Sequence, residues 1–114
     1  MSRQHTCRAM YKGVSADVFI DGLAQKLPDN RHVRFDYALF VEGSDKQGGS
    51  ATVNVDFSGK SPKTHVSNKG HRLDVQIESF MDDGLPYQVK ADMSLIDTNS
   101  DAALATYEFT VWNR

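Results

Sequence analysis

Apolar and polar residues alternate one by one in several stretches of this chain. The pattern is clearest in residues 32–42, where the odd positions are apolar and most even positions are polar. A period of two is typical of a β-strand with one buried face and one solvated face. The same alternation recurs in residues 51–57, 72–80, 85–95 and 103–112. Any fold that this chain adopts must therefore cover one face of at least five strands.

The spacing of these segments predicts an antiparallel sheet. The gaps at 81–84 and 97–101 are short and rich in Asp, Gly, Asn and Ser, which is typical of hairpin turns. Parallel strands would need a helix between them, and no helix fits these gaps. Residues 6–11 predict a short first strand. We therefore expect a mainly β fold, a meander of about six strands that closes as a small barrel or a sandwich.

Residues 15–27 allow two interpretations. As a helix, the segment would have Ser15 as its N-cap and Pro28 as its stop. Its apolar stripe would contain Ala16, Phe19 or Ile20, Leu23 and Leu27. As a hairpin, alternating residues would lead into a turn at Asp21-Gly22. Gly22 would cost a helix about 1 kcal/mol. The helix is the favoured prediction, and it would make the fold α+β.

Length and composition fit one β-rich domain over residues 1–114. Hydrophobic residues make up 39% and charged residues 25%, as in ordinary globular proteins. No apolar run reaches the roughly 20 residues of a membrane span, and residues 1–13 lack the apolar stretch of a signal peptide. Cys7 is the only cysteine, which excludes an internal disulfide and mildly favours a reducing compartment. We expect a cytoplasmic protein or, alternatively, an exported form whose leader has been removed.

Three aromatic residues break the alternation. In a meander, Phe40, Phe80 and Trp112 would all lie near the same end of the sheet on its polar face. Aromatic side chains are favoured anchors of protein interfaces. The residues predicted to bind a partner are these three together with Pro86, Asp82 and Asp83 at the rim. The alternative is a structural cluster covered by a loop or by a second copy.

Basic residues concentrate in and around residues 59–72, which contain four Lys or Arg and no acid. A basic cluster of this kind can hold phosphate or another polyanion. The residues of this alternative site are Arg31, His32, Arg34, Lys60, Lys63, Lys69, His71 and Arg72. A solvated, mobile loop explains the same composition. The aromatics are expected at the opposite end, without the interleaving that single-strand nucleic-acid binders use.

Catalytic signatures are absent from the sequence. It contains no G-x-S-x-G, P-loop, G-x-G-x-x-G or C-x-x-C motif, and its four histidines have no metal-ligand spacing. We therefore expect no cofactor or metal and favour a non-enzymatic protein-interaction module, such as an inhibitor, an immunity-type antagonist or an assembly subunit. The expected partner is a protein, with self-association as one form. Anion or nucleic-acid binding is one alternative, and a small enzyme or ligand carrier with a site at a barrel mouth is another.

Overall fold

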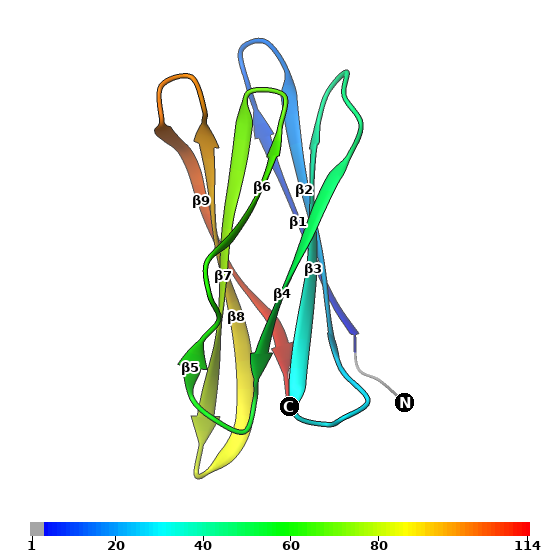
Figure 1. Ribbon diagram of the computed structural model, residues 1–114, viewed down its shortest axis with the longest axis vertical. Coiled ribbons are helices and arrows are strands. Elements are labelled where there is room, and N and C mark those ends of the chain that lie inside the picture. Colours follow the sequence, from blue (N-terminus) through cyan, green and yellow to red (C-terminus); the bar gives the residue numbers. More distant parts are fainter. Residues whose placement is uncertain (1–3) are drawn as a thin grey trace.

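The computed structural model describes residues 4–114, apart from the side chains of Gln4 and Tyr87, and its regular structure is entirely β (Figure 1). It consists of nine strands in two antiparallel sheets that pack face to face. The first sheet has the order β1-β2-β3-β4, and the second has the order β5-β7-β8-β9, with β6 also paired to β7. The strands are β1 (Gln4–Lys12), β2 (Asp17–Lys26), β3 (His32–Val41), β4 (Gln47–Asn54), β5 (Gly59–Lys60), β6 (Thr64–Asn68), β7 (His71–Asp82), β8 (Leu85–Asp97) and β9 (Ala102–Asn113). The prediction of a mainly β, antiparallel fold is confirmed, as a sandwich.

The alternating residues of both sheets meet in one core. On β3, every odd residue from 33 to 41 is buried and every even residue is partly exposed. The buried positions of β7 and β8 face them from the second sheet. The largest fully buried side chains are Phe35, Ile20, Leu39, Leu73, Ile77, Met93 and Leu95. Burial of this apolar surface is the main term that holds the two sheets together.

The helix predicted for residues 15–27 is wrong. The segment contains β2, which pairs with β1 on one side and β3 on the other. The hairpin alternative is right in type but wrong in position, because the chain turns between Lys12 and Asp17. Gly22 lies in the middle of β2, where a Cβ atom would come within 2.4 Å of the Phe35 ring. This glycine therefore permits close packing of the strand rather than a turn.

The segment between residues 58 and 71, which was expected to be a long loop, contains two short strands. It carries β5 and β6, which lie end to end along β7. Pro62 falls in the break between them, as expected for a residue that cannot donate to a ladder. The neighbouring Ser61 is buried, and its hydroxyl accepts a hydrogen bond from the Ile77 N–H at 3.0 Å. The sequence did not predict these two short strands, which lie where the chain passes from the first sheet to the second.

The two predicted hairpin turns are confirmed. Asp82 pairs with Leu85 across a two-residue turn in which Asp83 and Gly84 both have positive φ. Two residues of this kind form the mirror-image turn that fits the twist of a hairpin. Asp97 pairs with Ala102 across the other turn.

Polar side chains join the sheets on the side where β4 lies near β6. The buried Asn68 amide donates to the carbonyls of Leu39 and Asp45, both at 2.9 Å. The Tyr37 hydroxyl donates to the Thr64 hydroxyl oxygen at 2.7 Å. These bonds fix β6 and the β3–β4 loop against the first sheet.

Candidate partner-binding site

The structure does not bring Phe40 together with Phe80 and Trp112. Phe40 lies near the end of β3 in the first sheet, whereas the other two lie in the second sheet. In Figure 1, β3 runs upward and β7 runs downward, so Phe40 is near the top and Phe80 near the bottom. The extra strand line β5–β6 explains the error, because it reverses the direction of β7 relative to the predicted meander.

Trp112 lies in the core rather than on the polar face. Only 4% of its surface is exposed. A β-bulge makes the difference: Val89 pairs with Trp112 and Lys90 with Thr110, which leaves Val111 as an extra residue. One extra residue shifts the alternation, so an even-numbered side chain turns inward. The Lys26 ammonium lies 5.7 Å from the centre of the indole ring and covers it.

The other predicted partner-binding residues surround the β7–β8 turn. Phe80 is partly buried under the Lys90 ammonium, which lies 5.6 Å from the ring centre. Pro86 is partly buried as well, and Asp82 and Asp83 are exposed. This turn has Phe80, Pro86, Asp82 and Asp83 around it, without Phe40 and without an accessible Trp112.

The basic residues are spread along the length of the molecule. Arg31 lies just before β3, and His32 and Arg34 lie at its start. Lys69, His71 and Arg72 lie at the β6–β7 turn, at the opposite end of the molecule, and Lys60 and Lys63 lie in and after β5. Several are paired with acids: His32 with Asp29 at 2.6 Å, Arg34 with Asp36 at 3.2 Å and Arg72 with Asp74 at 2.8 Å. The Arg31 N–H and the His32 side chain hold the pKa of Asp29 below its usual value. The predicted basic residues are therefore divided between separate parts of the molecule, and several of them are paired with acids.

The described residues contain no group of three or more His, Cys, Asp or Glu side chains placed to hold a metal ion. None of them belongs to a helix with the length and apolarity of a membrane span. Burial, with a smaller contribution from Asp21, raises the pKa of the Cys7 thiol to about 11. A thiol with so high a pKa is a poor nucleophile at neutral pH.

Phe40 belongs instead to a row of apolar side chains on the outer face of the first sheet. In the strand register, Met10 lies opposite Phe19, and Phe19 lies opposite Phe40. The two phenylalanine rings are in contact, with centroids 5.9 Å apart. Met10 is 55% exposed, and both phenylalanines are partly exposed. We call these three residues the apolar row.

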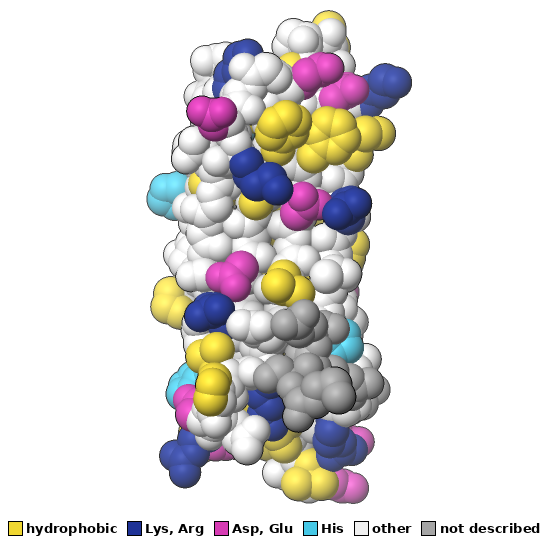
Figure 2. Space-filling view, turned by 90° about the vertical axis from the view of Figure 1, so that its right-hand side faces the viewer, with side chains coloured by type: hydrophobic (Ala, Val, Ile, Leu, Met, Phe, Trp, Pro, Cys, Tyr) yellow, Lys and Arg dark blue, Asp and Glu magenta, His cyan; other side chains and the backbone are white. Residues whose placement is uncertain are grey.

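Charged residues lie on both sides of the apolar row. Asp17 and Glu42 lie on one side, where a Glu42 carboxylate oxygen accepts from the Asp17 N–H. On the other side, Asp21 pairs with Arg8 at 3.0 Å and with Lys46 at 3.7 Å. Figure 2, which views the first sheet from outside, shows apolar side chains gathered near one end of this face with charged side chains around them.

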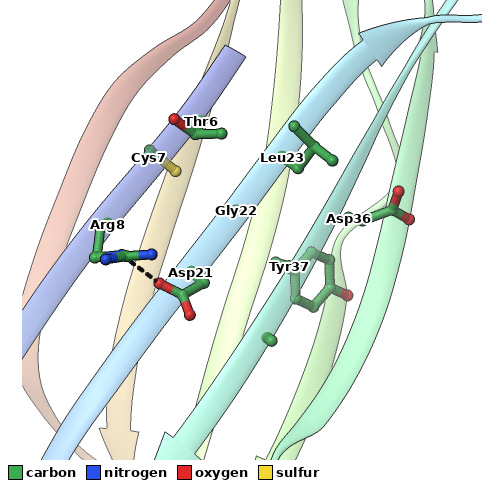
Figure 3. A pocket seen from close by; sticks show the side chains of 9 residues that line it. Thr6, Cys7, Arg8, Asp21, Gly22, Leu23, Asp36 and Tyr37 are labelled. Atoms are coloured by element: carbon green, nitrogen blue, oxygen red, sulfur yellow. Dashed lines mark hydrogen bonds and ion pairs between the residues drawn. The ribbon is translucent and has the colours of Figure 1, made fainter. Parts of the chain in front are cut away.

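A shallow hollow adjoins the apolar row. Its volume is about 470 Å³, and it is lined by side chains of β1, β2 and β3, among them Thr6, Arg8, Asp21, Leu23 and Asp36 (Figure 3). A second hollow, lined by Arg8, Phe19, Asp21, Phe40 and Lys46, continues from it over the apolar row. The face therefore offers an apolar centre, a polar rim and a depression beside it.

Sequence reasoning found Phe40 but missed Met10 and Phe19. Phe40 stood out because it breaks the alternation of its own strand. Phe19 did not, because the helix interpretation placed it in the buried stripe; read as a strand, residues 17–26 give it outward parity. Comparisons with protein-family models, curated proteins and solved structures find no match to this chain.

Proposed function

We propose that this protein is a non-enzymatic interaction module that binds a protein partner through the outer face of its first sheet. The observation that carries this proposal is the apolar row of Met10, Phe19 and Phe40. Three large apolar side chains in register, each at least partly exposed on a sheet face, cost solvation free energy unless another surface covers them.

The surroundings of the apolar row support a protein as the partner. Interface hot spots are centrally placed aromatic side chains ringed by polar residues that exclude water. Arg8, Asp17, Asp21, Glu42 and Lys46 form such a ring, in which Asp21 is paired with Arg8 and Lys46, and Asp17 and Glu42 add two further acids. A nearly neutral rim does not favour a polyanion, which would require unpaired cations. We therefore expect partner binding to depend weakly on salt.

The test replaces the two aromatic residues of the row together, as Phe19→Ser with Phe40→Ser. Phe57→Ser is the matched control, because Phe57 is 67% exposed and lies outside the row. The immobilised wild-type protein and both variants would be used to capture partners from extracts of the source cells, and each captured protein would be titrated by calorimetry.

The double variant is expected to weaken binding about 30-fold or more, since aromatic hot spots carry most of the affinity of an interface. The Phe57→Ser variant should bind like the wild type. Equal binding by all three proteins would contradict the proposal and direct attention to the acidic β7–β8 turn.

A further inference from the structure

A second surface, on the other sheet, lies at the free edge of β9. Most of the partly buried apolar side chains that pack against the core lie where β1 and β9 are side by side. They are Cys7, Ala9, Tyr11, Leu104, Tyr107 and Phe109. The rings of Tyr107 and Phe109 are stacked, with centroids 6.4 Å apart and planes 14° apart. Burial raises the pKa of Tyr107, and Tyr11 contributes to the rise.

β9 pairs with β8 along one edge, and no strand of the described residues pairs with its other edge. Natural edge strands are commonly protected by shortness, by Lys or Pro, or by bulges. β9 has twelve residues, neither Lys nor Pro, and Glu108 as its one charged side chain. The opposite edge of the second sheet is different, because β5 and β6 are two and five residues long and are separated at Pro62.

Bulges protect only the ends of β9. Irregular pairings with β8 fall at Leu95–Ile96 and at Val89–Lys90, whereas residues 105–110 pair without interruption. This regular stretch, Ala-Thr-Tyr-Glu-Phe-Thr, is rich in residues with high β-propensity. Its backbone is the part of the edge that can extend a ladder.

We propose that β9 of one copy pairs antiparallel with β9 of a second copy, so that their second sheets become one continuous sheet. Strand addition of this kind satisfies the outward backbone groups of both edges. It also covers Tyr107 and Phe109, which are partly exposed in a single copy. A contact of one surface with the same surface of a second copy, about a two-fold axis, is the usual arrangement of homodimers.

Charge selects the register of this pairing. A two-fold axis at Glu108 would place two carboxylates directly opposite each other, which is unfavourable. Moving the axis to Tyr107 places Glu108 opposite Thr106 of the second copy. Moving it to Phe109 places Glu108 opposite Thr110. Both of these registers pair aromatic rings across the axis and keep the outward residues on one face.

The two registers make a matched pair of variants informative. Thr106→Glu introduces carboxylates that oppose Glu108 if the axis is at Tyr107, and Thr110→Glu does the same if the axis is at Phe109. Both threonines are exposed in a single copy, so neither substitution disturbs the core. Sedimentation equilibrium of the wild type and both variants, in low salt over a wide concentration range, would measure the dimer dissociation constant.

We expect wild-type dimers whose dissociation constant rises about tenfold in one of the two variants. Weakening by either variant, with unchanged circular dichroism, supports the β9 contact. A wild type that stays monomeric at all concentrations would overturn it, as would a dimer that both variants leave intact. A dimer lost only in Phe19→Ser with Phe40→Ser would also overturn it, and would assign self-association to the apolar row instead.

Discussion

The two long sides of the sandwich are closed by different kinds of contact. Where β4 lies near β6, buried polar side chains bridge the sheets: Asn68 donates to two carbonyls, and Tyr37 donates to Thr64. Where β1 lies beside β9, half-buried apolar and aromatic side chains such as Tyr107 and Phe109 cover the core. The first side is held by hydrogen bonds between buried groups. The second side, which we call the open side, is held by apolar contacts and is partly exposed to water.

The lengths of the strands explain this difference. β6 has five residues and contributes Val66, which is partly buried, as its main apolar contact with the core. So little buried area provides a small hydrophobic term, and hydrogen bonds from buried donors must fix the strand in place. β9 has twelve residues and can be held by its ladder with β8 and by apolar packing alone. Its outer edge therefore stays available.

Removing the polar bridge at Asn68 should have the largest effect on stability. Asn68→Leu keeps the volume of the side chain but leaves the carbonyls of Leu39 and Asp45 without this donor. We expect the free energy of unfolding to fall by about 2–3 kcal/mol, since buried polar groups that lose their partners are costly. Urea denaturation followed by far-UV circular dichroism would measure it.

Tyr107→Leu is the control on the open side. This ring is partly exposed already, so the loss should be about 1 kcal/mol or less. The contrast between the two sides would be refuted if Tyr107→Leu destabilised the protein as much as Asn68→Leu.

The sequence predicted the strands well, because alternation reports burial directly. Residues 32–42 and 72–80 became β3 and β7 with the expected buried positions. The sequence did not predict β5 and β6, because strand pairing rather than an alternating pattern determines where they form. β5 and β6 have weak alternation and form because they hydrogen-bond to β7. Since they add one pass of the chain, every later strand runs in the direction opposite to the predicted one.

The same limits decided which residues of the candidate site could be predicted from the sequence. Phe40 could be recognised because its neighbours alternate strictly. Trp112 could not be placed, since a bulge opposite Val89 changes the parity of the strand end and leaves no mark in the sequence. The apolar row required the register of β1, β2 and β3, which follows from three-dimensional pairing of segments that single-sequence patterns do not align.

The reactivity of the Cys7 thiol measures how stably β1 is attached on the open side. Burial, followed by the charge of Asp21, raises its pKa from 9.0 to about 11, so the reactive thiolate at neutral pH is about a hundredfold scarcer than in the unfolded chain. We expect alkylation by iodoacetamide at pH 8 to be slower in the native protein than in urea by about this factor. Because the thiol pKa is higher in the folded state, its contribution to stability is present below pH 9 and is lost as the pH rises through 11.

Equal alkylation rates in the folded and unfolded protein would mean that β1 separates readily from β2. The open side would then be a region of local unfolding rather than a stable apolar contact. Cys7→Ser, which has no thiol, gives the background for this measurement.

The smallest predicted effect concerns the attachment of β9 itself. Asp92 on β8 lies directly opposite Glu108 on β9. Burial first, then Glu108 and Glu78, raise the pKa of Asp92, although Lys60 acts in the other direction. A carboxyl whose pKa is raised by folding favours the native state at low pH, and this contribution disappears as the pH rises through its folded-state pKa. Repulsion between Asp92 and Glu108 should therefore loosen the open side at neutral pH.

Asp92→Asn removes this repulsion and should stabilise the protein by a few tenths of a kcal/mol at pH 7, since solvent screens charges on an exposed face. The gain should be smaller at low pH, because Asp92, whose pKa is raised, then takes up a proton. Asp74→Asn is the matched control, because Asp74 pairs with Arg72 and its loss should be neutral or slightly destabilising. Urea denaturation of both variants at pH 7 and at low pH would measure the difference. A pH-independent gain, or a loss at pH 7, would show that the Asp92–Glu108 contact does not weaken the hold of β8 on β9.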